Sequence, residues 1–535
     1  MLKWSHVAML SGLLFLGCNS EDTKINTDTF NTNLMAEPTT LNPLTSTDGY
    51  ASSVQAYIME SLVTRDVDTY EFKPALATSW TISKDKKVFE FKLRQGVKWQ
   101  DGTPFTAEDV KFSFDALFDP KYNTAHMRPY YEGIEKVEIV DPQTIRFYAK
   151  DNYYKNFDSA SGIEVLPKHI YENPSDMKKL NKILIGTGPY KLEKYEKGKR
   201  IILSRSSDWW GNEEAAKTGE HNFKKISFRF VGEKTVALEM LKKGTIDFKG
   251  LDPEEYVSKT SDKIWETDLK KLKVENKSPK GYNFYGWNFK SKIFQDKRVR
   301  RALNHLVNRS LMLDKFEFNL SEYATGPLYV QSDYASKKVK PIMYDPKEAL
   351  RLLNEAGWSD TDGDLVLDKV IDGVKTKFSF TVLDPYDGFM KYNTIFKEDA
   401  KKIGVDVEIK VLEWNSFVKL LDEKKFDAIR MAWGGGSVDW EPKQIWHSSS
   451  IAQGSNFISY HNPEVDKLID EARLIFDTQT RIKKLQKVYE IIADDAPYAF
   501  FFNSRYAMYA HRNRIWKPKE TFTYGVGQSF WKIVE

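Results

Sequence analysis

The chain has a single cysteine, Cys18, among its 535 residues, so no disulfide bond within the chain can hold its fold together. This cysteine directly follows an apolar run, residues 7–17, which is preceded by Lys3. A basic start, an apolar stretch of about ten residues and a small residue before the cut site are typical of a secretory signal, and the stretch is too short to span a bilayer as a helix. We therefore predict that residues 1–17 are a signal peptide.

The segment Phe15-Leu16-Gly17-Cys18 resembles the lipobox of bacterial lipoproteins, in which the cysteine after the cut site receives acyl chains. The resemblance implies that Cys18 is lipidated and anchors the protein in the cell envelope, on the periplasmic or cell-surface side of a membrane. An ordinary cleaved signal with an incidental cysteine is the alternative, but secreted proteins usually pair their cysteines and Cys18 has no partner in the chain. The polar residues 18–33 are predicted to form a tether between the anchor and the folded part.

Length and charge limit the class of protein. The chain is longer than one hydrophobic core usually serves, so two or three domains are expected. Its 80 Lys and Arg residues are interspersed with 76 Asp and Glu residues, which argues against a nucleic-acid partner. After the signal, no stretch approaches 18 uncharged apolar residues, so the membrane contact is predicted to be the N-terminal acyl anchor alone.

Local patterns predict alternating strands and helices. Residues 88–93 alternate apolar and polar side chains, as a half-buried strand does. Thr106, followed three residues later by Asp109, predicts a capped helix start, and Asn462-Pro463 predicts another. A further helix is expected over residues 52–62.

Several short motifs stand in one order along nearly the whole mature chain. They lie at residues 74–80, 91–99, 101–110, 186–190, 208–211, 296–303, 344–346 and 462–466. This series resembles the signature of family 5 solute-binding proteins, the peptide-binding receptors of ABC importers. A single motif such as Gly-Thr-Gly-Pro-Tyr is weak evidence, whereas the ordered series is strong evidence.

The resemblance implies an α/β fold of the two-lobed periplasmic-binding-protein type (type II, cluster C), with an extra domain inserted in the first lobe. Lobe I is assigned to residues 34–64, 186–285 and 500–535, the inserted domain to 65–185, and lobe II to 286–499. The ligand would be a peptide or peptide-like solute enclosed as the lobes close. The resemblance also implies an ABC permease as partner, a monomeric receptor and no cofactor.

Peptide receptors of this family present a carboxylate from lobe II to the ligand's ammonium group, shortly after a run that contains aromatic residues. The corresponding run here is residues 431–442, and Asp439 is the predicted carboxylate. The chemistry fits, because an ammonium removed from water must meet a negative acceptor. A turn-forming Asp that caps backbone amides is the alternative. Gly436 stands where oligopeptide receptors have tryptophan, which leaves open a nickel chelate, haem, a glycan or a peptide-nucleotide antibiotic as cargo.

The same run contains further candidate ligand contacts. Two indole rings are predicted to line the cleft, with core packing as the alternative. Three glycines could let backbone approach the ligand, with a hinge-like loop as the alternative; no Gly-Lys-Ser/Thr follows, so a phosphate loop is not expected. A guanidinium could bind a ligand carboxylate through two hydrogen bonds. These residues are Trp433, Trp440, Gly434, Gly435, Gly436 and Arg430.

Residues 360–368 superficially resemble a calcium loop. Glycine stands at the fourth rather than the sixth position, and Ile371 stands where a bidentate Glu is needed, so we predict a surface hairpin and no metal site. The eight histidines show no His-Glu-x-x-His spacing, and no Gly-x-Ser-x-Gly is present. We therefore predict that the protein is not an enzyme, and an envelope chaperone or hydrolase remains the alternative from another class.

Overall fold

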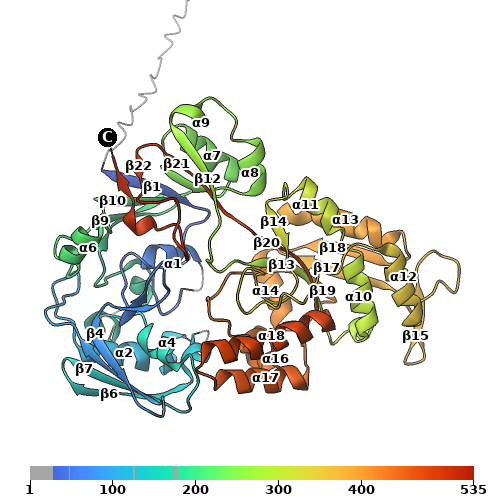
Figure 1. Cartoon of the computed structure of the whole chain (residues 1–535), viewed down its shortest axis with the longest axis horizontal. Coiled ribbons are helices and arrows are strands. Elements are labelled where there is room, and N and C mark those ends of the chain that lie inside the picture. The colour runs from blue at the N-terminus through green and yellow to red at the C-terminus, as the bar shows by residue number, and fades with distance from the viewer. Residues whose placement is uncertain (1–27, 47–48, 125–126, 174–176, 535) are drawn as a thin grey trace, which may run out of the picture.

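The computed structural model describes residues 28–46, 49–124, 127–173 and 177–534. Figure 1 shows two bodies side by side, one built from the first half of the chain together with the C-terminal segment, the other from the yellow and orange segments between them. Cys18 and the predicted signal peptide lie outside the described residues. Within the described ranges, no helix is long and apolar enough to cross a membrane.

Lobe I contains two sheets and a hairpin. The four-stranded sheet has the order β1 (Thr29–Leu34), β10 (Lys225–Phe230), β9 (Arg200–Arg205) and β8 (Tyr190–Glu196), and the three-stranded sheet has the order β11 (Phe248–Gly250), β21 (Ala507–Arg512) and β12 (Leu269–Val274). Strands β22 (Ile515–Trp516) and β23 (Lys532–Ile533) form the hairpin. The helices of lobe I are α1 (Gly49–Gln55), α6 (Asn212–Thr218), α7 (Lys234–Lys242), α8 (Pro253–Ser258) and α9 (Ile264–Thr267).

Strand β1 corrects the predicted tether. Residues 29–33 were assigned to the tether, but they pair in parallel with β10 in the lobe I sheet. Four of the six residues of β1 are buried, and two of those are threonines, Thr29 and Thr32. The strand has the sequence Thr-Phe-Asn-Thr-Asn-Leu, in which four of the six residues are polar. Because of this polar composition, the segment resembled a solvated linker.

Helix α1 ends seven residues earlier than the predicted helix 52–62. The chain beyond it packs against the Gly-Thr-Gly-Pro-Tyr motif, where the Gly188 N–H donates to the Ile58 carbonyl at 2.9 Å. A Cβ on Gly186 would lie 1.8 Å from that carbonyl oxygen, so only glycine permits this close approach. The motif therefore fixes the chain that follows α1.

The inserted domain is an antiparallel sheet with helices on it. The sheet order is β4 (Ala77–Ile82), β5 (Val88–Leu93), β7 (Thr144–Ala149) and β6 (Ile134–Asp141), preceded by the hairpin β2 (Val63–Arg65) and β3 (Phe72–Pro74). Its helices are α2 (Ala107–Phe118), α3 (Arg128–Tyr131), α4 (Asn156–Ser161) and α5 (Lys168–Tyr171). The predicted strand at 88–93 is confirmed, and so is the capping box formed by Thr106 and Asp109.

Glu60 joins lobe I to the inserted domain. Its carboxylate accepts the indole N–H groups of Trp209 at 3.3 Å and Trp210 at 2.8 Å, and its carbonyl accepts the Val165 N–H. Burial raises the pKa of Glu60 to about 7, against the opposing effect of the indole hydrogen bonds and of Arg94. The paired tryptophans of the 208–211 motif thus hold a carboxyl group at the boundary between the two units.

Lobe II is built on one mixed sheet of six strands. Their order is β14 (Ser321–Tyr323), β20 (Tyr498–Ser504), β13 (Tyr282–Trp287), β19 (Ala428–Trp433), β17 (Ser379–Asp384) and β18 (Asp406–Val411). Alternate residues of β13 enter two separate cores: Tyr282 and Phe284 one, Tyr285 and Trp287 the other. Both faces of the sheet are therefore covered.

Two groups of helices cover these faces (Figure 1). One group contains α10 (Lys297–His305), α12 (Pro346–Glu355) and α13 (Met390–Lys401), and the other α14 (Trp414–Asp422), α17 (Pro463–Arg473) and α18 (Thr478–Asp495). Shorter elements are α11 (Arg309–Lys315), α15 (Lys443–Trp446), α16 (Ser450–Gln453) and the hairpin β15 (Asp368–Ile371) with β16 (Val374–Lys377). The predicted start of α17 is confirmed, because the Asn462 side chain caps it and Pro463 is its first residue.

The chain crosses between the lobes at residues 275–281, from β12 to β13, and at 505–506, from β20 to β21. The predicted boundaries after residues 285 and 499 fall inside β13 and β20, which pair with each other in the lobe II sheet. Strand pairing fixes the crossing points, and composition does not reveal which sheet an apolar strand will join.

Candidate ligand-binding site

The predicted ligand-binding run begins at the end of β19, the strand between β13 and β17. Strand β17 pairs with β19 only at Val382 with Ala428 and at Leu383 with Ile429, and then ends at Asp384. The pairing with β13 continues to Trp433. Residues 430–433 therefore have a partner strand on one edge only.

Backbone alternation identifies the groups that face the open edge of β19. The Asn288 N–H donates to the Asp427 carbonyl, so Asp427 directs its backbone groups toward β13. In an antiparallel pair every second residue does so, which here means residues 429, 431 and 433, while the residues between them direct their backbone groups to the other edge. The N–H and C=O of Ala432 therefore point away from β13. Within the described ranges, no backbone partner faces Ala432 on that side.

A cavity of about 490 Å³ lies at this open edge, which is within the size range of small-ligand pockets. It is bounded by the end of β19, the chain just after β17, helix α14 and Phe457. The lining residues are Pro385, Tyr386, Trp414, Val418, Leu421, Arg430, Met431, Ala432, Trp433 and Phe457. We refer to it below as the aromatic cavity.

Arg430 lines this cavity, but its charge is already matched. Its Nε and Nη2 donate to one carboxylate oxygen of Asp384, at 2.9 and 2.7 Å. Arg430 is 5% exposed and Asp384 is fully buried. The predicted contact between this guanidinium and a ligand carboxylate gains no support from the geometry and stays a prediction.

The two predicted tryptophans have different environments. Trp433 is half-buried and lines the aromatic cavity, with its ring parallel to that of Phe457 at a centroid distance of 6.0 Å. Trp440 is 7% exposed and packs in the lobe II core, edge-on to Tyr489. Its ring packs against α18, which favours the core-packing alternative, and the contact between Trp440 and a ligand stays a prediction.

The three glycines also differ from one another. A Cβ on Gly435 would lie 2.3 Å from the Pro279 carbonyl oxygen, in one of the two crossings between the lobes, whereas Gly434 has open space. Gly436 has a φ of +66°, a conformation that glycine adopts without strain. The loop thus packs at Gly435 against a crossing between the lobes, and Gly434 leaves its backbone open to close approach.

Asp439 has a charge partner inside lobe II. Its Oδ1 accepts the Tyr334 hydroxyl at 3.0 Å and lies 3.5 Å from Nη2 of Arg481, which is buried. The carboxylate compensates this guanidinium in the protein as it stands. Contact between Asp439 and a ligand ammonium is not tested by these distances and stays a prediction.

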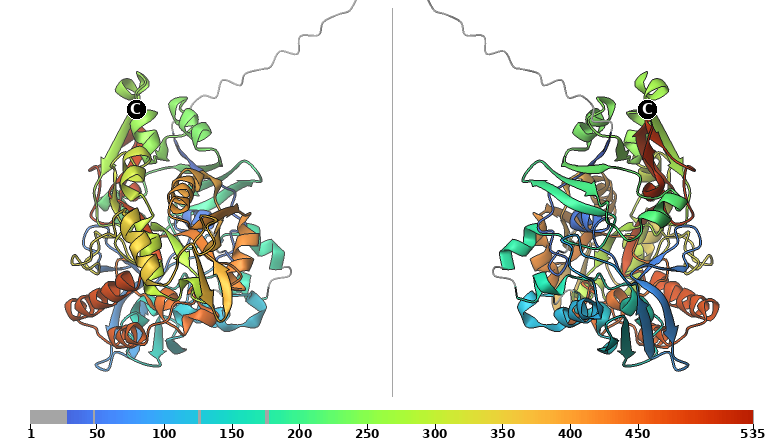
Figure 2. Two further views of the ribbon diagram at one scale, coloured as in Figure 1. Left: turned by 90° about the vertical axis from the view of Figure 1, so that its right-hand side faces the viewer. Right: turned by 90° about the vertical axis from the view of Figure 1, so that its left-hand side faces the viewer.

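Residues 153–155 of the inserted domain, just before α4, contact the same loop. The Tyr154 hydroxyl donates to the Trp440 carbonyl at 2.9 Å, and the Arg481 guanidinium lies 4.0 Å from the Tyr154 ring centre. The Tyr153 hydroxyl donates to Glu441. Both views in Figure 2 show the inserted domain beside α17 and α18.

This contact joins the inserted domain to the lobe II loop, and the sequence analysis did not predict it. The only available signal was the tandem of aromatic residues followed by Lys155, whose Nζ donates to the Ser437 hydroxyl at 3.2 Å. Nothing in such a tandem says which distant segment it will meet. The loop is therefore held from the hinge on one side and from the inserted domain on the other.

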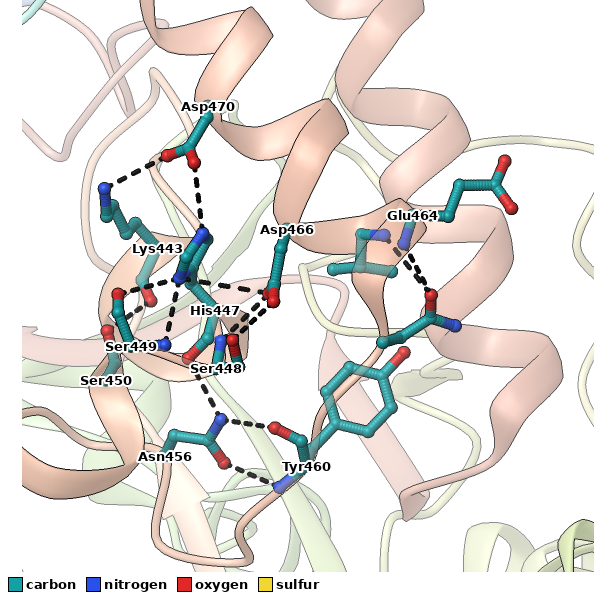
Figure 3. A network of polar contacts seen from close by, with 12 residues as sticks. Lys443, His447, Ser448, Ser449, Ser450, Asn456, Tyr460, Glu464, Asp466 and Asp470 are labelled. Carbon is teal, nitrogen blue, oxygen red and sulfur yellow. Dashed lines mark hydrogen bonds and ion pairs between the residues drawn. The ribbon is translucent and has the colours of Figure 1, made fainter.

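The segment after the loop is fixed to α17 by the polar network in Figure 3. His447 Nδ1 contacts the Ser449 hydroxyl at 2.7 Å and Nε2 contacts Asp470 at 3.3 Å, an arrangement that superficially resembles a catalytic triad. The Ser449 backbone N–H also donates to Nδ1, and Asp470 is exposed and paired with Lys443. The contacts are those of a local turn before α16, in which the His447 side chain accepts a backbone N–H two residues on, so they give no support to the hydrolase alternative.

The acidic segment 360–367 is a loop closed by an isolated bridge between Ser359 and Asp368, and the hairpin β15–β16 follows it rather than coinciding with the predicted one. Carboxylate oxygens of Asp360, Asp362 and Asp368 lie within 4.8 Å of one another. Lys375 pairs with both Asp362 and Asp368, at 2.8 and 3.4 Å. The local negative charge is thus met by a lysine of the adjoining strand.

The structure has two lobes joined by two crossings, and a cavity lies at the open edge of β19 in the lobe II sheet. This arrangement is typical of binding proteins that enclose a solute between two lobes. The chain belongs to the bacterial extracellular solute-binding proteins, family 5: the model of the middle region of that family matches residues 71–455. This membership agrees with the resemblance seen in the motif series.

Similar proteins cover nearly the full length. The oligopeptide-binding protein AppA of Bacillus subtilis is 31% identical over 493 residues, which span 89% of this chain and 86% of AppA. The structure of AppA in complex with a nonapeptide has a TM-score of 0.78 at 28% identity, covering 95% of this chain and 99% of that one. NikZ of Campylobacter jejuni in complex with Ni(L-His) also has a TM-score of 0.78, at 26% identity, covering 94% of this chain and 99% of that one. The two-lobed α/β fold is confirmed.

Proposed function

We propose that this protein is the receptor of an ABC importer, which captures peptides or peptide-like solutes between its two lobes and delivers them to a membrane permease. Family membership and the peptide ligand in the similar AppA structure support the proposal. We further propose that the receptor acts as a monomer held in the cell envelope by acyl chains on Cys18. The lipobox-like sequence supports this anchor.

The open edge of β19 is the observation that carries the peptide assignment. An unpaired strand edge can add an extended peptide as a further strand, with main-chain hydrogen bonds that do not depend on side chains. Here the edge is short, from residue 430 to 433, and it opens into a cavity rather than onto the outer surface. A peptide backbone running beside Ala432 would satisfy the backbone groups that point there.

An N-methyl scan of a bound peptide tests this pairing. Native mass spectrometry of the purified mature protein would first identify a co-purified peptide, and a peptide at a hundredfold excess over its Kd should stabilise the protein by about 2.7 kcal/mol. Synthetic copies would then carry a single N-methyl group at successive residues. Because neighbouring N–H groups of a strand point in opposite directions, methylation opposite Ala432 should weaken binding about tenfold or more, while methylation at the next residue should not.

A uniform effect of methylation at every position would contradict strand pairing, and failure of all peptides to bind would contradict the proposed function. The second candidate is the same receptor role for a non-peptide cargo such as a nickel chelate, motivated by Gly436 in place of tryptophan and by the Ni(L-His) ligand of the similar NikZ. Recovery of a metal chelate, haem or glycan in the native mass spectrum would favour it.

A further inference from the structure

Two large aromatic side chains of the aromatic cavity are more than half exposed. Trp414 is 56% exposed and Tyr386 is 51% exposed, and both face the same cavity. Large apolar side chains gathered in a concave site, rather than scattered singly over the surface, mark a binding site. Figure 1 places α14, which begins at Trp414, near the middle of the molecule, where the two bodies meet.

One wall of the cavity is a stack of rings. The Trp433 ring is nearly parallel to the rings of Phe457 and Phe284, at interplanar angles of 8° and 18°. Phe284 in turn stacks on Tyr498 at 3.7 Å, and the Tyr498 hydroxyl accepts the Trp433 indole N–H at 3.4 Å. The wall is therefore fixed in orientation before any ligand arrives, which lowers the entropic cost of binding.

The charge of the cavity favours an uncharged occupant. Among its described lining residues, Arg430 is the one charged group, and Asp384 pairs with it through two hydrogen bonds. A ligand ammonium or carboxylate entering here would lose its hydration without meeting an unpaired opposite charge, and that desolvation would not be recovered. An apolar group pays no such cost and gains the burial of its surface.

The cavity lies next to lobe I. Lys391 of α13, five residues after the cavity residue Tyr386, pairs with Glu254 of α8 in lobe I at 3.7 Å. Contacts from lobe I thus reach lobe II beside the cavity. A side chain held in it would be covered as the lobes approach each other.

From these observations we propose that the receptor selects its peptides by one bulky, uncharged, apolar side chain, aromatic or large aliphatic, which the aromatic cavity receives from the residue paired near Ala432. This inference rests on the proposed function and names the substrate class within it. Trp414 and Tyr386 are the residues that determine the preference, because they contribute the most exposed ring surface. Neither is part of a core cluster, so replacing them leaves the fold intact.

A positional library tests the proposal by calorimetry. Tetrapeptides would carry Ala, Leu, Phe, Glu or Lys at one position at a time in an otherwise alanine background. At one position, Phe or Leu should bind about tenfold tighter than Ala, and Glu and Lys should bind no better than Ala. In Trp414→Ala and Tyr386→Ala proteins this preference, the ratio of the affinity for the Phe or Leu peptide to that for tetra-alanine, should fall to about threefold or less.

Trp516→Ala is the matched control, because it removes an exposed tryptophan from the lobe I hairpin β22–β23 and should leave the preference unchanged. Peptides that bind without any side-chain preference, or a Trp414→Ala protein that retains the full preference, would overturn this inference and leave the proposed function standing. A preference for Glu or Lys would also overturn it. If no peptide in the library or from the native mass spectrum binds, both proposals fail together.

Discussion

The buried pair of Asp384 and Arg430 predicts a large local destabilisation in an Asp384→Asn protein. Asp384 is fully buried and accepts four hydrogen bonds: two from Arg430, one from Asn393 at 2.6 Å and one from the Tyr386 backbone N–H at 2.9 Å. An asparagine of the same shape can keep part of this geometry, but it leaves the buried guanidinium without an opposite charge.

The expected magnitude follows from this burial. Removing one partner of a buried ion pair costs about 3–5 kcal/mol, because the remaining charge is uncompensated. Every 1.4 kcal/mol is a factor of ten, so the local opening equilibrium should rise by about two to three and a half orders of magnitude. The amides of β17 and β19 should exchange faster by that factor, up to the limit set by global unfolding.

Hydrogen exchange measured by mass spectrometry is the suitable assay, because a protein of several domains need not unfold in one two-state transition. Asp406→Asn is the control, since it changes an exposed carboxylate on β18 of the same sheet and should leave exchange in β19 unchanged. The double variant Arg430→Met/Asp384→Asn should be less destabilised than the two single variants together. Two results would refute the argument that Asp384 neutralises the charge of Arg430 in the cavity. One is an amide exchange rate that rises less than tenfold in Asp384→Asn, and the other is a destabilisation of the double variant equal to the sum of those of the single variants.

Three further outcomes are expected. Cys18→Ser should move the protein from the membrane fraction to the soluble fraction with unchanged ligand affinity, and a mutant that stays membrane-bound and labelled by palmitate would contradict the anchor. Asp439→Asn should weaken free peptides in calorimetry and leave N-acetylated peptides nearly unchanged, because the predicted partner of the carboxylate is the ligand ammonium; an equal loss for both kinds of peptide would contradict that contact and indicate that Asp439 acts only through buried Arg481. Burial lowers the pKa of His511 from 6.5 to about 4, so the unfolded chain binds a proton between these values that the folded protein does not, and stability should fall as the pH decreases through that range. His511→Gln should flatten the pH profile of the melting temperature, whereas His461→Gln, at an exposed position, should leave its slope as in the wild type.

The sequence by itself determined the family and much of the local structure. The ordered motifs indicated the two-lobed fold, the alternation at residues 88–93 predicted β5, and the caps at Thr106 and Asn462 predicted the starts of α2 and α17. These features depend on residues close together in the chain, so a pattern within a few positions is enough to identify them. The sequence also predicted a ligand-binding run at residues 431–442, of which Met431, Ala432 and Trp433 line the aromatic cavity.

Only the tertiary structure showed which of the predicted ligand contacts already have partners inside the protein. The patterns around Arg430, Asp439 and Trp440 could not show that Asp384, Arg481 and the lobe II core already engage them, because these partners come from distant segments. The open edge of β19 depends on where β17 stops, and the ends of lobe II depend on which sheet β13 and β20 join. Charge pairing, burial and strand order are properties of segments brought together by folding, and for that reason no short stretch of the chain contains them.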